Sequence, residues 1–176
     1  AMGPFTVGDL SGLDIAWARR KRLALHRDPR ERVVPIPDRL CEAGRLGKKT
    51  GAGYYAYPAG ARRGVHDPSV DAIIDAARAE RGIAPRRITD DEIVQRVLCS
   101  ILSGALAVVE TGVCAAPSDV DVAMTEGFAF PRWRGGPLHD LAGRPSSWVD
   151  EGIGAVAASC PVTFANLEGA DARERV

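Results

Sequence analysis

Apolar residues recur at helical spacing along most of the chain, most clearly in residues 89–112. One apolar row consists of Ile93, Val97, Ile101, Ala105 and Val108, and Val94, Leu98, Leu102 and Val109 widen it. A stripe this wide is typical of a helix that is buried over much of its surface. Thr89 followed three residues later by Glu92 is the pattern of a capping box, and Gly112 supplies the end. The pattern therefore predicts a long helix in the protein core.

Shorter patterns predict further helices, and no stretch alternates as a strand would. The expected helices cover 10–25, 36–46, 67–82, from 118 through 124, and from 146 or 147 to 156. Residues 58–65 contain glycine, proline and arginine and are expected to form a loop. The residues after Pro161 are mostly polar and are expected to fray. The chain is therefore predicted to be mostly α.

The stretch GRLGKKTGAGYYAY, residues 44–57, is similar in composition to a phosphate-binding P-loop. That motif requires G-x-x-x-x-G-K-[ST] after a buried strand. Here Glu42 stands where the first glycine is required, and Lys49 stands where a serine or threonine is required. We therefore expect a helix end followed by a glycine turn, with the three tyrosines packing an extended segment.

Two distant parts of the chain share a short pattern. Gly3-Pro4 is followed by DLSG at residues 9–12, and Gly136-Pro137 is followed by DLAG at residues 140–143. Chance similarity of common residues is one explanation, and an internal repeat is the other. A long and a short helix precede the second copy, whereas the first copy begins at residue 3. An internal repeat would mean that the chain starts inside its first copy.

Charge and composition exclude several classes of function. Lysine plus arginine and aspartate plus glutamate both number 23, so no net charge attracts nucleic acid or an anionic membrane. No run approaches 18 consecutive apolar residues, so we expect no membrane span. Arg132 and Arg134 flank Trp133 in a loop that we expect to pack through Phe128, Phe130 and Trp133 rather than bind nucleic acid.

Cysteine and histidine spacing indicates no metal site and no cysteine nucleophile. The four cysteines are far apart in the sequence, and the three histidines show no ligand spacing. Lone cysteines among apolar neighbours are typical of reduced residues in an intracellular protein. We expect the bacterial cytoplasm, with the mitochondrial matrix left open.

Four blocks in this order give the chain a resemblance to a known family. They are AMGPFTVGDLSGLDIAW, GRLGKKTGAGYYAY, EIVQRVLCSILSGALAVVETGVCAAPSDVDVAM and GFAFPRWRGGPLHDLAG. Over roughly residues 1–145 the chain resembles 3-hydroxyacyl-CoA dehydrogenases, in particular the C-terminal part of multifunctional fatty-acid β-oxidation α-subunits. The resemblance implies an all-α helical domain of the 6-phosphogluconate dehydrogenase C-terminal-like type, as a tandem repeat with a truncated first copy. The implied divisions are 1–57 (first repeat), 58–66 (linker), 67–160 (second repeat) and 161–176 (polar tail).

The resemblance also implies a reaction, the NAD-dependent oxidation of 3-hydroxyacyl-CoA to 3-ketoacyl-CoA. The G-x-G-x-x-G fingerprint of the Rossmann domain and the family's histidine in H-x-x-N-P are absent from this sequence. The glutamate that partners that histidine and the substrate-contacting asparagine of the first repeat are absent as well. We therefore expect a fragment without catalytic residues of its own. Its expected partners are an upstream Rossmann domain and an acyl-CoA substrate.

The resemblance assigns roles to individual residues. Lys49, the second lysine of the GKKTG block, is implied to approach the NAD held by the Rossmann domain; the alternative is a solvated turn lysine. Glu126 stands where related α-subunits often have a tyrosine near the acyl-CoA path, which makes it a candidate substrate-binding residue. An acid there would repel CoA phosphates if it faced them. Gln95 matches the substrate-contacting asparagine of the first repeat but is expected to be an ordinary helix residue.

Two functions of different classes remain at this point. The first is the C-terminal region of a dehydrogenase, which supports the substrate cleft and the association of domains. The second is a stand-alone helical interaction module without catalysis. If the chain begins inside its first repeat, Phe5, Leu10, Leu13 and Trp17 are expected to be uncovered, together with one side of the helix at 92–110, and self-association into a homo-oligomer would cover them.

Overall fold

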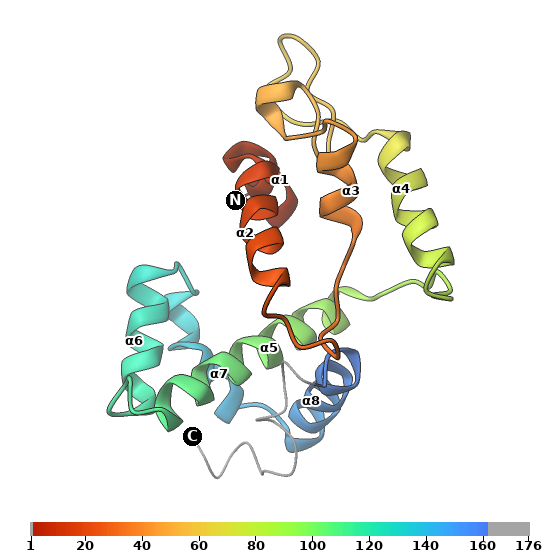
Figure 1. The fold of residues 1–176 in the computed structure, drawn as a ribbon. Helices are drawn as coiled ribbons and strands as arrows, with labels where there is room; N and C mark the ends of the chain where they lie inside the picture. Colours follow the sequence, from red (N-terminus) through yellow and green to blue (C-terminus); the bar gives the residue numbers. More distant parts are fainter. Residues whose placement is uncertain (1, 162–176) are drawn as a thin grey trace. The chain divides into compact units, whose positions relative to one another are not determined.

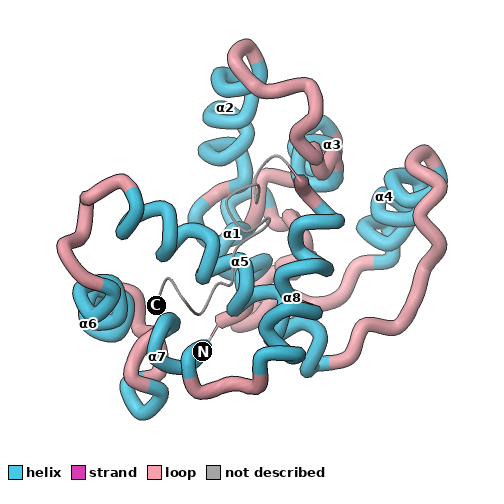
Figure 2. Tube along the Cα trace, turned by 90° about the horizontal axis from the view of Figure 1, so that it is seen from below, coloured by secondary structure: helices cyan, strands magenta, loops and turns pink. Residues whose placement is uncertain are grey.

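The computed structural model describes residues 2–161 and is built from helices joined by loops (Figure 1). The α-helices are α1 (Pro4–Ser11), α2 (Leu13–Ala24), α3 (Ile36–Glu42), α4 (Pro68–Ala79), α5 (Asp90–Glu110), α6 (Pro117–Gly127), α7 (Pro137–Ala142) and α8 (Ser146–Ser159). Two 3₁₀ turns, η1 (Lys48–Thr50) and η2 (Arg132–Arg134), complete the elements. Between residues 2 and 161 no strand forms, as Figure 2 also shows, and isolated β-bridges occur only within residues 47–65. The all-α prediction is confirmed. The predicted polar tail lies almost entirely outside the described residues.

The chain divides into two compact units, which are described separately below. Unit 1 consists of residues 1–29 and 33–86, and unit 2 consists of residues 30–32 and 87–176. Unit 1 therefore holds α1–α4, and unit 2 holds α5–α8. The predicted linker at 58–66 lies within unit 1, because α4 packs against α3. The repeat boundaries proposed from the sequence stay a prediction, since spatial packing does not define a sequence repeat.

A small apolar core holds unit 1 together. Its buried members are Leu13, Leu40, Cys41 and Val70, and six partly buried side chains surround them. The core joins α2, α3 and α4, which places the glycine-rich loop beside it. Asp67 accepts a hydrogen bond from the backbone N–H of Ser69, and this cap starts α4 as the Asp-Pro pair predicts.

The single helix expected over residues 10–25 is wrong, because the chain turns sharply at Gly12. Gly12 has φ +95°, a conformation that favours glycine, and it separates α1 from α2. The backbone N–H of Leu13 then donates to the carbonyl of Leu46 at 3.1 Å. The turn also buries Leu13 and leaves Trp17 partly buried against the core, so neither is uncovered as expected. Phe5 and Leu10 are exposed, in agreement with the expectation.

The helix predicted over residues 36–46 is shorter than expected. α3 ends at Glu42, and Gly44, with φ +74°, follows in the left-handed region. The residues up to Leu46 therefore belong to the loop that leads into η1.

In unit 2 the long helix α5 lies at the centre. It contacts α6, α7 and α8, and its start is capped by Thr89, whose hydroxyl accepts from the N–H of Glu92 at 3.2 Å. The buried cluster around it comprises Leu98, Leu102, Ala105, Leu106, Val120, Phe130, Leu138, Leu141 and Val149. The predicted long core helix is confirmed.

The composition of α5 also meets the length and hydropathy criteria for a membrane span. Of its most apolar 18-residue stretch, 33% is buried inside the structure. A central helix of a globular domain meets the same criteria. The prediction of a chain without a membrane span therefore stays a prediction.

Two features of the connections in unit 2 differ from expectation. α6 starts at Pro117 rather than at Ser118, and Asp119 in its first turn accepts from the N–H groups of Ala115 and Ala116, which precede the helix. α7 was not expected as a helix. Asp121 of α6 accepts from the N–H groups at the start of α7, at Leu138 (2.8 Å) and His139 (3.1 Å), which supplies a cap that comes from another helix.

Candidate functional site

The glycine-rich stretch of unit 1 is a tight loop around the 3₁₀ turn η1. Gly47 (φ +104°) and Gly51 (φ +76°) flank the turn, and a β-bridge joins Gly47 to Ala52. The hydroxyl of Thr50 accepts from the N–H of Leu46 at 3.0 Å, which closes the loop from within. Helix α3 precedes the loop, where a P-loop would have a strand. The predicted helix end and glycine turn are confirmed.

A buried carboxylate, Asp9 of α1, fixes the second half of this loop. Only 1% of Asp9 is exposed, and its oxygens accept from the backbone N–H groups of Tyr54 (2.8 Å) and Tyr55 (3.0 Å) and from the hydroxyl of Tyr57 (3.1 Å). A Cβ at Gly53 would come within 2.0 Å of this carboxylate, and one at Gly47 within 2.3 Å of the Asp9 carbonyl. The two glycines therefore allow the loop to close around Asp9.

Two tyrosines of the loop, Tyr54 and Tyr57, have raised pKa values in this environment. Burial, followed by the hydrogen bond to Asp9, raises the pKa of Tyr57 to about 12. Burial likewise raises the pKa of Tyr54, whose ring lies 4.5 Å from that of Phe5. Both tyrosines are therefore neutral hydrogen-bonding and packing groups at physiological pH.

Lys49, the predicted cofactor residue, lies on η1 and meets Asp14 in the first turn of α2. Its Nζ lies 2.6 Å from Oδ1 of Asp14, while its side chain is 50% exposed. The hydrogen bond from Lys49 lowers the pKa of the Asp14 carboxyl. Asp14 was missed at the level of sequence because 35 residues separate it from Lys49.

Glu126, the predicted substrate residue, lies near the end of α6 in unit 2. Its carboxylate pairs with the guanidinium of Arg132 at 2.6 Å, and both side chains are exposed. Lys49 and Glu126 thus belong to different units. Gln95 donates from Nε2 to the carbonyl of Trp148 at 2.7 Å, which ties α5 to α8 and agrees with a structural role.

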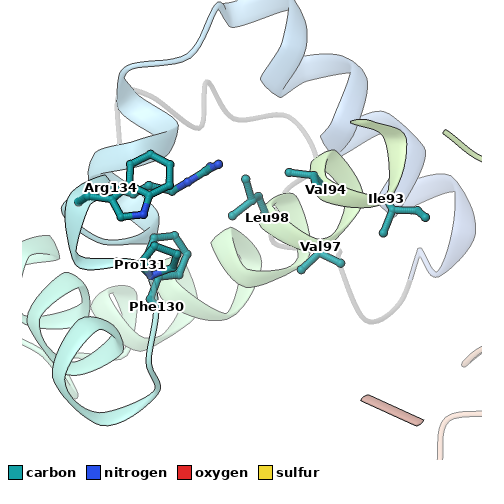
Figure 3. A pocket seen from close by; sticks show the side chains of 8 residues that line it. Ile93, Val94, Val97, Leu98, Phe130, Pro131 and Arg134 are labelled. Atoms are coloured by element: carbon teal, nitrogen blue, oxygen red, sulfur yellow. The ribbon is translucent and has the colours of Figure 1, made fainter. Parts of the chain in front are cut away.

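The loop between α6 and α7 buries fewer of its aromatic side chains than the sequence predicts. Phe130 is buried, but Phe128 and Trp133 are 75% and 81% exposed, so the expectation that all three anchor the loop is wrong. Arg134 lies over the Trp133 ring at 4.7 Å. Figure 3 shows Phe130, Pro131 and Arg134 across from the apolar side chains at the start of α5, where a groove of about 290 Å³ lies.

Cysteine and metal chemistry find no support in the described part of the chain. Residues 2–161 hold no cluster of histidine, cysteine and acidic side chains suited to a metal ion. The four cysteines are free thiols, and burial raises the pKa of Cys99 to about 11, which keeps that thiol protonated and unreactive.

Comparisons with known proteins agree with the resemblance drawn from the sequence. Residues 1–57 match the family model described as 3-hydroxyacyl-CoA dehydrogenase, C-terminal domain. The peroxisomal bifunctional enzymes of Danio rerio and Homo sapiens are 38% and 39% identical over 150 residues, which cover 78% of this chain and 21% of each relative. The peroxisomal fatty acid beta-oxidation multifunctional protein of Oryza sativa is 33% identical over 161 residues, 85% of this chain and 22% of that protein. The chain thus spans about a fifth of the length of these curated relatives.

A solved structure supports the fold. The dehydrogenase part of multifunctional enzyme 1 from C. elegans matches 98% of this chain and 36% of that chain, with a TM-score of 0.58 and 24% identity. The helical architecture of this chain is therefore one that occurs in that protein. Together, these matches confirm the resemblance of the chain to the C-terminal region of 3-hydroxyacyl-CoA dehydrogenases.

Proposed function

We propose that this chain is the C-terminal helical region of an NAD-dependent 3-hydroxyacyl-CoA dehydrogenase that acts in fatty-acid β-oxidation. The names of the relatives and the family match over residues 1–57 support this assignment. The histidine motif and the Rossmann fingerprint are absent from the sequence, so the catalytic groups and most of the NAD site belong to an upstream domain. The role of this chain is to support the substrate cleft and the association of domains.

Lys49 is the residue through which this chain contacts NAD in the proposal. The observation that carries it is the position of Lys49 on a turn fixed by Asp9, within the segment that the family model matches. A half-exposed ammonium on a fixed turn offers positive charge to an anionic cofactor of a neighbouring domain.

The test is a kinetic comparison in the complete enzyme that contains this chain. We expect Lys49→Ala to raise the KM for NAD by a few-fold to tenfold, about 0.5–1.4 kcal/mol, as for one solvent-screened contact. Lys48→Ala is the matched control, because Lys48 is the neighbouring exposed lysine on the same turn, and it should leave this KM unchanged. An unchanged KM for NAD in Lys49→Ala, together with a lower melting temperature, would assign Lys49 to the stability of the turn instead.

The same assays examine Glu126, which we propose to lie near the acyl-CoA path. Arg132 partly neutralises Glu126, and this ion pair reduces the repulsion that the acid would exert on CoA phosphates. Glu126→Gln should change the KM for the acyl-CoA and leave the KM for NAD as it is. A changed KM for NAD together with an unchanged KM for the acyl-CoA would contradict the proposal that Glu126 lies near the acyl-CoA path.

A homo-oligomer is part of the proposal as well. The exposed apolar side chains Phe5 and Leu10 of α1 support it, since a second copy would cover them. The relatives are named as peroxisomal proteins. The cytoplasmic location expected for this chain stays a prediction.

A further inference from the structure

Within unit 1, the Lys49–Asp14 ion pair lies against a glycine at the corner between α1 and α2. We propose that Asp14 is a positioning residue for Lys49: its carboxylate holds the ammonium at the Gly12 corner, in the orientation in which that ammonium meets an anionic group of the dinucleotide. This inference rests on the proposed function, in which Lys49 contacts NAD. It assigns a role to a residue that neither the motifs nor the resemblance singled out.

The backbone on either side of η1 is fixed at two points, one on α2 and one on α1. Before η1, the carbonyl of Leu46 accepts from the N–H of Leu13, the first residue of α2. After η1, the N–H groups of Tyr54 and Tyr55 donate to Asp9, at the end of α1. The turn therefore cannot move away from the α1–α2 corner without breaking buried hydrogen bonds.

The side chain of Lys49 needs a partner to take one direction. A lysine carries a flexible four-carbon stem, and a half-exposed one samples many rotamers unless a contact selects among them. Asp14 is well placed to make this selection, since it lies in the first turn of α2 and its own backbone is helical. The distance of 2.6 Å between Nζ and Oδ1 is that of a charge-assisted hydrogen bond.

Gly12 provides the space that the ion pair occupies. A Cβ at this position would come within 2.8 Å of Oδ1 of Asp14 and 3.2 Å of Nζ of Lys49. The left-handed conformation of Gly12 also creates the turn that separates α1 from α2. Gly12 therefore leaves the space for an ion pair in which Asp14 supplies the carboxylate and Lys49 the ammonium.

The ion pair leaves Lys49 able to bind a second anion. An ammonium has three N–H donors, and the contact with Oδ1 of Asp14 uses one of them. The other two have no partner that the structure requires them to keep, and half of the side chain is exposed. The carboxylate thus orients the charge without enclosing it.

The test uses four variants of the complete enzyme: Asp14→Asn, Asp14→Glu, Lys49→Ala and the double variant Asp14→Asn/Lys49→Ala. Asp14→Asn keeps the shape of the side chain and removes its charge, and it should raise the KM for NAD about two- to fivefold, the size expected for an exposed ion pair. The kcat and the KM for the acyl-CoA should not change. Asp14→Glu should restore much of the NAD affinity. In the Lys49→Ala background, Asp14→Asn should have no further effect, because the two residues act through one contact.

Asp71→Asn serves as the matched control. Asp71 is an exposed carboxylate of the same unit that pairs with His66, so its loss changes the net charge equally but leaves Lys49 untouched. It should leave the KM for NAD as it is, and the thermal midpoint of Asp14→Asn should stay within a few degrees of the parent.

Each other outcome overturns a specific part of the inference. A lower KM for NAD in Asp14→Asn would mean that Asp14 competes with the cofactor for Lys49. An equal rise in the Lys49→Ala background would mean that Asp14 acts independently of Lys49. If Lys49→Ala itself leaves the KM for NAD unchanged, both the cofactor role of Lys49 and the positioning role of Asp14 are wrong.

Discussion

Units 1 and 2 each contain a corner in which a Gly-Pro pair starts a short helix and a glycine ends it. The helices are α1 and α7, and each carries an aspartate near its end, Asp9 or Asp140. Asp9 is buried and binds backbone N–H groups of the glycine-rich loop. Asp140 instead pairs with the guanidinium groups of Arg134 (3.3 Å) and Arg144 (2.9 Å). The same local pattern thus fixes a loop in one unit and pairs with two arginines in the other.

The leucine that follows each aspartate shows a second difference. Leu141 is 3% exposed, because α7 packs against the long helix α5. Leu10 is 46% exposed in unit 1. The Gly-Pro…Asp-Leu pattern therefore determines the backbone corner, whereas the neighbouring helix determines whether the leucine belongs to a core.

The largest expected effect follows from this pair of leucines. Leu141→Ala should lower the free energy of unfolding of unit 2 by about 2–5 kcal/mol, because it leaves a cavity beside α5. In the monomer, Leu10→Ala should change the stability of unit 1 by less than about 1 kcal/mol, as at an exposed position. Urea denaturation followed by circular dichroism measures both variants, at protein concentrations below and above self-association. The cost of Leu10→Ala should rise where the proposed homo-oligomer forms, and a cost that stays small at every concentration would contradict the covering of Leu10 by a second copy.

A smaller effect should separate the two aspartates. Asp9→Ala removes the acceptor of two backbone N–H groups and one tyrosine hydroxyl, and the cost should be roughly 2–3 kcal/mol. Asp140→Ala removes ion pairs with partly exposed arginines and should cost about 1 kcal/mol or less. The same denaturation experiment measures the two variants. Equal costs would contradict the different roles assigned to the two residues.

The sequence was sufficient for the elements whose signals are local. The apolar rows and Thr89 predicted α5, and Asp67-Pro68 predicted the start of α4, because helix periodicity and capping depend on neighbours within a few residues. The glycine turn at 44–57 was predictable for the same reason. Lys49 was selected through the family resemblance, and its role stays a prediction.

Features that depend on distant contacts were not predictable in this way. The break between α1 and α2 is fixed by the hydrogen bond from Leu13 to Leu46, and a glycine within an apolar helical pattern does not reveal it. Asp9 and Asp14 bind residues of the glycine-rich loop that lie 45 and 35 residues further along the chain, so their roles depend on how that loop folds back. The exposure of Trp133 was also missed, since an aromatic side chain is consistent with either burial or a surface position.

The smallest expected effect concerns Tyr57, whose contact with Asp9 has no counterpart in unit 2, since all three tyrosines of the chain lie at residues 54–57. Tyr57→Phe should lower the free energy of unfolding at neutral pH by about 1 kcal/mol, because one hydrogen bond to a carboxylate is lost. The pKa of Tyr57 is raised to about 12 in the folded protein, while an unfolded tyrosine ionises near its ordinary value of 10.0. The folded state therefore holds this proton more tightly, and the stability that Tyr57 contributes is complete below pH about 10 and declines between about 10 and 12.

The difference between the parent protein and Tyr57→Phe should follow the same course. It should be constant from neutral pH to about 10 and shrink steadily above that value. Cys41 and Cys99, whose thiol pKa values are also raised by burial, are present in both proteins, so their alkaline titration cancels in the difference. Urea denaturation across a series of alkaline pH values measures the difference directly. A difference that stays constant up to pH about 12 would mean that Tyr57 titrates alike in the folded and unfolded states, and the closed loop around Asp9 would then not shield it from solvent.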